Sequence, residues 1–205
     1  MTNVLSEKDY QKFLLERLSQ DNGYVIRKAA NFDRRFAVDR EMLFKFLNDT
    51  QPDTMEYLRK IYKDDLEDTI VSFINAETTK ARGSLIEVLK HGIEISNQKL
   101  ELMYTKPATT FNPELTRKYG QNIFSVMEEV WASDKERIDV VIFLNGHAII
   151  SFELKCNTSG QSYQDAIYQY RTERNPKTRL FLFKAGCLVN FAMDLEEVYM
   201  TTKLA

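Results

Sequence analysis

The stretch of residues 137–155 constrains the fold of this chain more than any other. Two runs dominated by apolar and β-branched residues, 137–144 and 147–155, flank the dipeptide Asn145-Gly146. An Asn-Gly pair between two such runs is the strongest short-range signal for a β-hairpin, because both residues readily adopt the positive φ angles of a tight turn. The sequence therefore predicts a β-hairpin at this place.

Three charged residues lie inside this apolar hairpin: Asp139 near its start, and Glu153 and Lys155 at its end. A charge in a buried strand loses its hydration, which costs several kcal/mol unless the charge is paired or holds a metal ion. These three residues are therefore the first candidates for a functional site. The alternative is that Glu153 and Lys155 form a solvated neighbour pair at a sheet edge and have no function.

The composition sets the class of protein. The chain has 205 residues, of which 43% are hydrophobic, so it can bury a core. Its 28 basic and 30 acidic residues argue against a domain that binds nucleic acid through bulk charge, but they allow an enzyme that acts on DNA held by another part. Cys156 and Cys187 have no metal-ligand spacing, which favours thiols in a reducing cytoplasm. No apolar run approaches the roughly 20 residues of a membrane span, so we expect a soluble cytoplasmic protein that contacts no membrane.

The periodicity of apolar residues changes along the chain. Helical spacing predicts helices in the first half, at residues 7–19, 39–48, 53–62, 64–81 and 85–90. Strands follow, at 99–104, 122–130, 179–184 and 188–193, with a helix at 161–172; of these, 122–130 also suits a helix. We therefore expect an α/β or α+β fold, a sheet with helices packed on it. A mainly helical portion, 1–92, would pack on a core, 93–205, within one compact domain.

The turn decides whether the charged residues can meet. With a two-residue turn and an unbroken ladder, Asp139 would lie opposite Phe152, and Glu153 would point to the other face. A three-residue loop, or a bulge further along, would let Asp139 and Glu153 converge on one cation. We therefore predict an odd-length loop or a bulge. His147, next to the turn, is expected to be exposed.

Two converging carboxylates would suit Mg²⁺, which takes few protein ligands and keeps several waters. Such an ion can lower the pKa of a bound water and neutralise charge on a phosphate. Lys155 could orient or deprotonate the water, or stabilise the developing charge. Arg171 and Arg174, at the end of the following helix, could contact a phosphate. This constellation predicts a phosphodiester hydrolase with Asp139 and Glu153 as metal ligands.

The same residues resemble a known family. Asp139 followed by Glu153-Leu154-Lys155 resembles the PD-(D/E)XK nuclease motif, with Ile138 in place of the usual proline. The longer string, through Asn145-Gly146 to Gly160 and Gln169-Tyr170-Arg171, resembles the N-terminal nuclease domain of the restriction (R) subunit of type I restriction-modification enzymes. The resemblance extends to residues 22–24 and 190–194 and covers most of the chain. It implies a restriction-endonuclease-like mixed sheet flanked by helices, with a helical N-terminal portion.

The resemblance implies roles for individual residues. Asp139, Glu153 and Lys155 match the nuclease residues of the family. Many members add a Gln-x-x-x-Tyr motif on the next helix; we assign its glutamine to Gln169, which leaves Glu173 at the tyrosine position, whereas Gln164 and Tyr168 have the spacing but lie earlier. The family also tends to place a glutamate of an N-terminal helix near the metal. Glu7 and Glu16 are the candidates, with a solvated helix residue as the alternative for each.

The resemblance also implies cofactors and partners. The cofactor would be Mg²⁺, with Mn²⁺ as a substitute, and ATP would serve a DNA-translocating motor region that this chain lacks, since it has no phosphate-binding loop. The partners would be DNA and the methylation and specificity subunits of the restriction complex. Two other functions remain open: a stand-alone PD-(D/E)XK nuclease in repair or recombination, and a catalytically inactive docking domain.

Overall fold

A mixed β-sheet forms the body of the molecule. The computed structural model describes residues 6–157 and 160–204. Its main sheet has eight strands, in which β6, β7 and β8 are antiparallel neighbours, β9 runs parallel to β8, and β1 runs parallel to β6. The strands are β1 (Val25–Arg27), β2 (Phe32–Asp33), β3 (Val38–Asp39), β6 (Phe124–Trp131), β7 (Arg137–Leu144), β8 (His147–Leu154), β9 (Val189–Met193) and β10 (Val198–Thr201). The predicted class, a mixed sheet flanked by helices, is confirmed.

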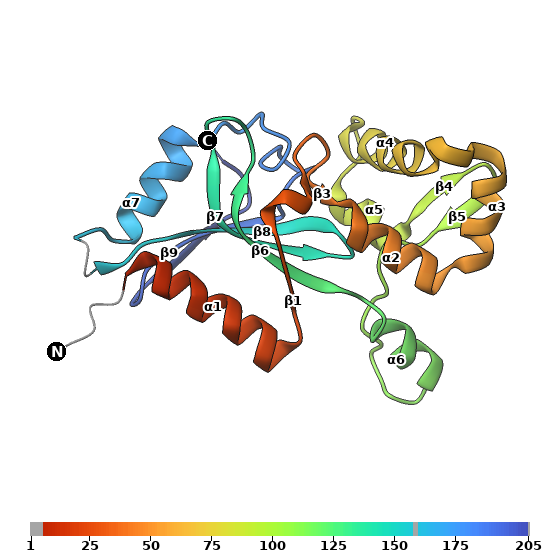
Figure 1. The fold of residues 1–205 in the computed structure, drawn as a ribbon, viewed down its shortest axis with the longest axis horizontal. Coiled ribbons are helices and arrows are strands. Elements are labelled where there is room, and N and C mark those ends of the chain that lie inside the picture. Colours follow the sequence, from red (N-terminus) through yellow and green to blue (C-terminus); the bar gives the residue numbers. More distant parts are fainter. Residues whose placement is uncertain (1–5, 158–159, 205) are drawn as a thin grey trace.

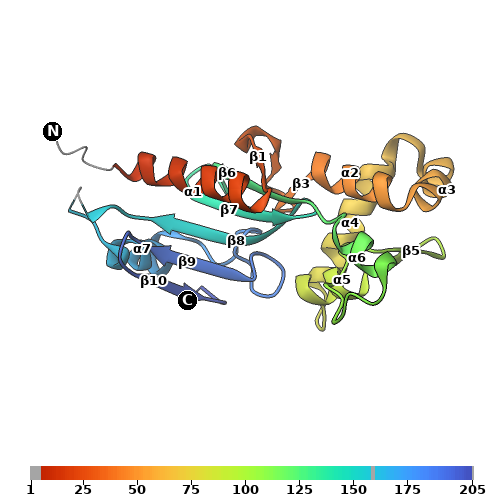
Figure 2. The same cartoon turned by 90° about the horizontal axis from the view of Figure 1, so that it is seen from below.

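Helices cover both faces of this sheet (Figure 2). Side chains alternate along β7, so that Val140 and Ile142 pack towards helix α1 (Glu7–Asn22), whereas Val141 and Phe143 join the core beneath helix α7 (Tyr163–Tyr168). The two cores bury the hairpin from both sides. Any charged side chain near its middle must therefore find a partner inside the protein.

A helical lobe is attached at the turn end of the β7–β8 hairpin (Figure 1). The lobe has its own apolar core, which includes Leu43, Phe46 and Ile70. Half-buried Arg179 links it to the region after α7, since its guanidinium donates to Asn75 Oδ1 at 2.8 Å and to Thr78 Oγ1 at 3.1 Å. The lobe consists of α2 (Arg40–Thr50), α3 (Pro52–Tyr62), the 3₁₀ helix η2 (Lys63–Asp65), α4 (Leu66–Thr79), α5 (Leu85–His91) and the strands β4 (Ile93–Ile95) and β5 (Gln98–Leu100).

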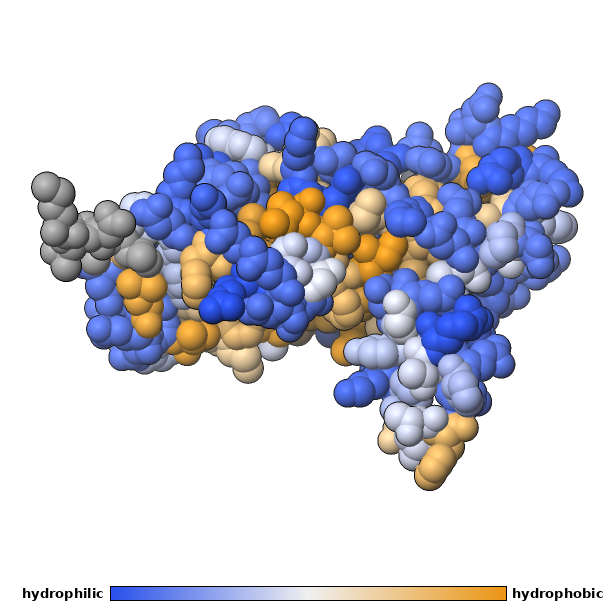
Figure 3. Space-filling view, turned by 60° about the horizontal axis from the view of Figure 1, so that its bottom comes forward, coloured by the Kyte–Doolittle hydropathy of each residue, from blue (hydrophilic) through white to orange (hydrophobic). Residues whose placement is uncertain are grey.

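The predicted boundary between residues 92 and 93 stays a prediction. Strands from both sides of it share the main sheet, since β1 pairs with β6 and β3 pairs with β8. The 3₁₀ helix η1 (Ala29–Asn31) lies between β1 and β2. Helix α6 (Pro113–Tyr119) projects from the body, with apolar surface at the tip of the projection (Figure 3). Phe111, next to this helix, is 91% exposed.

Local capping explains where several helices begin. Ser6 forms a capping box with Asp9 at the start of α1, and the Asp39 side chain accepts from Met42 N at the start of α2. The helices predicted in the first half are confirmed, with ends shifted by a few residues. Among the residues that the structure describes, no helix combines the length and hydrophobicity needed to cross a bilayer.

The strand predicted at residues 179–184 is wrong. This segment folds as consecutive turns, in which Phe181 N donates to Thr178 O and Cys187 N to Leu180 O. Leu180 and Phe181 are buried, so the apolar run fills the core from a compact loop. A short apolar run has the same sequence pattern in a buried strand and in a buried loop, so the pattern could not distinguish the two structures. Strand β10 was not predicted.

The Asn145-Gly146 turn is built as predicted. Asn145 has φ 47° and Gly146 has φ 81°, the positive angles of a type I′ turn. The Asn145 side chain is also fully buried: it accepts from Ile123 N at 2.7 Å and donates to Leu102 O at 2.9 Å. A Cβ atom at Gly146 would overlap the Asp39 carbonyl oxygen and lie 2.7 Å from Leu43 N.

We predict that Gly146→Ala lowers the free energy of unfolding by about 2 kcal/mol or more, because a positive φ and a steric clash add together. Gly23→Ala is the matched control. Gly23 also has a positive φ, 71°, but a Cβ there would meet nothing within 4 Å, so we expect a loss of only about 1 kcal/mol. Urea denaturation of both variants measures the difference; equal losses would contradict the clash.

His147 is buried, not exposed as expected. It opposes Val38 of β3, and among the described residues its Nε2 has no hydrogen-bond partner. Burial lowers the pKa of His147 to about 4, and the positive charge of Arg179 adds to the effect. The folded protein therefore holds this side chain neutral.

This depressed pKa predicts loss of stability in mild acid. The unfolded chain binds a proton at His147 near pH 6.5, and the folded chain does so only near pH 4. The stability contribution is therefore complete above pH 6.5 and is lost as the pH falls towards 4, by about 3 kcal/mol in total. We expect His147→Leu to flatten this part of the stability curve in urea titrations from pH 4.5 to 7. His91→Gln, at the exposed second histidine, should leave the curve unchanged.

Candidate active site

The register of the β7–β8 hairpin brings Asp139 next to Glu153. Leu144 pairs with His147 across the two-residue turn, and Phe143 pairs with Ala148, but Ile142 pairs with Ile150. Ile149 is therefore an extra residue in β8, and the ladder continues with Val140 opposite Phe152. The next residues outward are Asp139 and Glu153. The predicted bulge is confirmed, although the turn itself keeps two residues.

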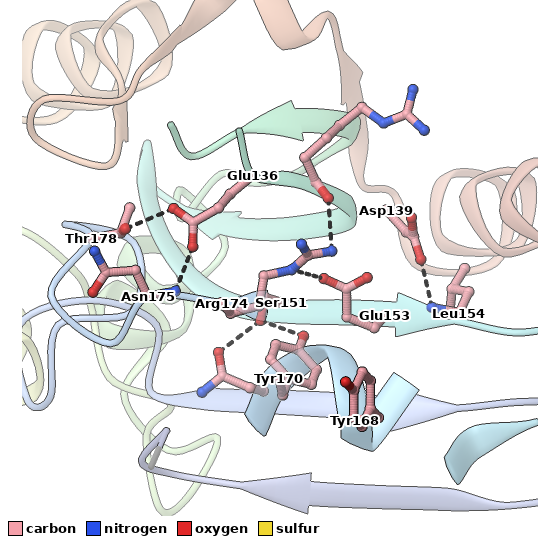
Figure 4. Close-up of polar contacts among 12 residues, drawn as sticks. Glu136, Asp139, Ser151, Glu153, Leu154, Tyr168, Tyr170, Arg174, Asn175 and Thr178 are labelled. Atoms are coloured by element: carbon pink, nitrogen blue, oxygen red, sulfur yellow. Dashed lines mark hydrogen bonds and ion pairs between the residues drawn. The ribbon is translucent and has the colours of Figure 1, made fainter. Parts of the chain in front are cut away.

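Asp139 lies where the two strands end their regular pairing. Its Oδ2 accepts a hydrogen bond from the backbone N–H of Leu154 at 2.7 Å, so the side chain takes the place of a carbonyl in the ladder (Figure 4). The residue is only 7% exposed. Burial raises the pKa of Asp139, while the Leu154 N–H and the charge of Lys155 act in the opposite direction. Asp139 is thus a buried and oriented carboxyl group.

Glu153 is the most deeply buried member of the site, with 0% exposure. Its Oε1 accepts from Arg174 Nε at 2.7 Å (Figure 4), whereas its Oε2 is buried and has no hydrogen-bond partner among the described residues. Burial raises the pKa of Glu153 to about 8, and the charge of Asp139 adds to this shift although Arg174 opposes it. An unpartnered buried carboxylate oxygen costs free energy and is therefore a candidate ligand atom.

Lys155 is held by the N-terminal helix. Its side chain is 6% exposed, and its Nζ lies 3.4 Å from Oε2 of Glu7, the first residue of α1. Both charges act on the pKa of Asp139. Glu16, the other candidate glutamate, is exposed and lies 3.8 Å from Lys12. Of the two candidates, the structure brings Glu7 to the site.

These contacts make a continuous series of charges, which we call the charged row: Glu7, Lys155, Asp139, Glu153 and Arg174. Glu7 pairs with Lys155, and Glu153 pairs with Arg174. Lys155 lowers the pKa of Asp139, and the strand register places Asp139 beside Glu153. The row contains three carboxyl groups and two cations. The structure thus brings together the three predicted nuclease residues and flanks them with two residues from distant parts of the chain.

Gln169 begins a π-helix, Gln169–Glu173, that continues α7. Its Oε1 is buried and has no hydrogen-bond partner among the described residues. Its contact with the row is through the backbone, where its carbonyl oxygen accepts from Arg174 N. Gln164 and Tyr168, the alternative pair, are exposed. The role of Gln169 stays a prediction.

The π-helix also supports the floor of the site through Tyr170. The Tyr170 hydroxyl lies 2.8 Å from Ser151 Oγ, which donates to Asn190 Oδ1 at 2.7 Å (Figure 4). Burial raises the pKa of Tyr170 well above its usual value, and the charge of Glu153 acts in the same direction. Tyr170 is therefore a neutral hydrogen-bonding group that fixes the helix to β8 and β9.

The sequence did not predict the contacts of two residues near the site, Arg174 and Glu129. Arg174, which the sequence offered as a possible phosphate contact, pairs with Glu153. Glu129 of β6 lies between the ladder pairs Glu128–Val140 and Val130–Ile138 and has φ 57°. Its Oε2 lies 2.6 Å from Arg137 Nη1. A positive φ in a strand is rare outside glycine and is typical of functional sites. No local signal distinguishes Glu129 from Glu128, because the backbone angle depends on the surrounding sheet.

The row can accommodate one hard cation. Within the described residues no cluster of three or more His, Cys, Asp or Glu side chains is arranged as a metal cage. Mg²⁺ does not require one, since it binds through one or two carboxylates and keeps several waters. The free Oε2 of Glu153, next to Asp139, supplies a ligand atom of this type. The residues present therefore fit Mg²⁺ or Mn²⁺.

The pKa of Glu153 can be measured directly. In ¹³C NMR titrations of the metal-free protein, we expect the Glu153 side-chain carboxyl to titrate near pH 8, far above the reference value of about 4.3 for a glutamate in a model peptide. The signal is assigned by its absence from Glu153→Gln. A midpoint for Glu153 below about pH 5 would contradict the desolvated environment described here.

Comparison with known proteins identifies the family of the chain. A search of curated proteins finds no match to the chain. The family model described as "Type I restriction enzyme R protein N terminus" matches residues 4–205, which is nearly the whole sequence. The match spans the bulged hairpin and every residue of the charged row. The chain belongs to the family of type I restriction enzyme R protein N termini.

Proposed function

We propose that this chain is a Mg²⁺-dependent DNA endonuclease domain of a type I restriction R subunit, which hydrolyses phosphodiester bonds. One observation carries the proposal: the buried Glu153 has a free carboxylate oxygen, Oε2, beside Asp139 at the end of the bulged hairpin. Membership in the R protein family supports the same activity.

Asp139 and Glu153 would hold the metal. Asp139 Oδ2 is engaged by Leu154 N–H, which orients the carboxyl group. Glu153 is fixed through Oε1 and offers Oε2. Bound Mg²⁺ supplies a water of lowered pKa and neutralises charge on the phosphate. Without the metal, the negative charges of the two carboxylates would repel the phosphate group of the DNA.

Lys155 would act on the reacting phosphate or the attacking water. Its ammonium group is nearly buried and is held on one side by Glu7. A desolvated cation stabilises negative charge much better than one in water, because the local dielectric constant is low. Lys155 can thus stabilise the charge that develops on the phosphoryl oxygens. Gln169 is proposed as an auxiliary residue of the same site.

The proposed partners are DNA and the methylation and specificity subunits of the restriction complex. With 28 basic and 30 acidic residues, the chain has little bulk attraction for DNA. In this proposal the other parts of the complex hold the DNA, and ATP drives their motor. The domain described here cuts the strand that they deliver.

Asp139→Asn and Lys155→Ala should each lower DNA cleavage by the assembled restriction complex about a hundredfold or more, because each removes a group that acts on the reacting phosphate or its metal. Cleavage of plasmid DNA with ATP and Mg²⁺ measures this effect. Glu16→Gln, at an exposed position of α1, is the control and should cut normally. Circular dichroism checks that the variants fold; full cleavage by both variants would refute the assignment.

A further inference from the structure

We propose that Arg174 is a positioning residue that holds one oxygen of Glu153 and leaves the other to bind the metal. This inference deepens the proposed function and rests on it. The two side chains form an ion pair that is almost completely shielded from solvent: Arg174 is 8% exposed and Glu153 is 0% exposed. Arg174 Nε donates to Oε1 at 2.7 Å, whereas Oε2 has no partner among the described residues.

The guanidinium of Arg174 is fixed on a second side. Its Nη2 donates to the backbone carbonyl of Arg137 at 3.1 Å (Figure 4). The planar guanidinium therefore bridges the start of β7 and the end of β8, the strands that supply Asp139 and Glu153. A group fixed at two points with this geometry sets the orientation of the carboxylate as well as its charge.

The backbone at Arg174 is also held in place. Arg174 N donates to Gln169 O at 3.0 Å and closes the π-helix. A π turn contains one more residue than an α turn, which rotates the next side chain by about 100° relative to a continuing α-helix. On the far side, buried Glu136 accepts from Asn175 N and from Thr178 Oγ1 at 2.8 Å. Arg174 thus lies between two anchored segments.

These contacts argue against the alternative that the Arg174 side chain occupies the metal position and moves away when the metal binds. A competing cation would have to leave when the metal binds, and Arg174 would then lose both the Glu153 and the Arg137 contacts while remaining buried. Leaving a buried guanidinium without partners is costly. The arrangement instead divides the carboxylate between two cations, with the arginine on Oε1 and the metal on Oε2.

Titration of the purified chain with Mn²⁺, followed by electron paramagnetic resonance, tests this role without requiring DNA cleavage. We expect Arg174→Gln to raise the Kd for Mn²⁺ about tenfold or more, as is usual when a partner that orients a metal ligand is removed. Arg174→Lys keeps the charge but supplies only a point donor, so its Kd should lie between those of Arg174→Gln and the wild type. It also serves as the test variant if Arg174→Gln does not fold.

Arg27→Gln is the matched control. Arg27 Nε also pairs with a fully buried carboxylate, Asp39 Oδ2 at 2.8 Å, but Asp39 lies at the turn end of the hairpin, where its N–H donates to Gly146 O. Removing Arg27 should cost stability in the same way and leave the Mn²⁺ affinity within about twofold of wild type.

The outcomes separate this inference from the proposed function. Mn²⁺ binding by Arg174→Gln that equals the wild type would overturn the positioning role, and tighter binding would show that Arg174 competes with the metal. Either result leaves the nuclease assignment in place if Glu153→Gln still abolishes binding. No binding by the wild type, or binding that survives Glu153→Gln, would overturn the metal site and this inference with it.

Discussion

The single extra residue in β8, Ile149, brings the carboxyl groups of the candidate site together. In a β-ladder, the face on which a side chain lies follows from the count of residues, and one added residue reverses it. Without the bulge, Glu153 would lie on the face opposite to Asp139. With it, two carboxyl groups from neighbouring strands reach the same point at the end of the hairpin. The metal fit, the raised pKa values and the proposed role of Arg174 all depend on this register.

Bringing the two carboxyl groups together costs free energy, and residues from several elements offset this cost. Two adjacent buried carboxyl groups repel each other, and neither has enough water to stabilise its charge. Lys155 and Arg174 offset this cost, and each is itself oriented by a distant element: Lys155 by α1 through Glu7, and Arg174 by the π-helix and the start of β7. With all five groups ionised the row carries three negative and two positive charges, so a bound divalent cation would favour the ionised forms of Asp139 and Glu153, whose pKa values burial raises.

Several parts of this arrangement could be predicted from the sequence because they rest on local rules. The Asn145-Gly146 pair defines the turn, and the positions of Asp139 and Glu153 require a register change. The place of the bulge could not be predicted, since an odd loop or a bulge anywhere in β8 has the same effect. Residues 179–184 were misread because an apolar run does not distinguish a strand from a buried loop. The partners of Glu153 and Glu129 depend on a π-turn and a strained backbone angle, which only the packed structure determines.

The buried side chain of Asn145 has a mechanical consequence. It hydrogen-bonds to Ile123 N and Leu102 O, on the connection between the lobe and β6, while the opposite end of the same hairpin carries Asp139 and Glu153. Gly146 in the same turn is packed so closely against Asp39 and Leu43 that even a Cβ atom would not fit. The Asn145 contacts therefore couple the connection between the lobe and β6 directly to the hairpin that carries the two carboxyl groups.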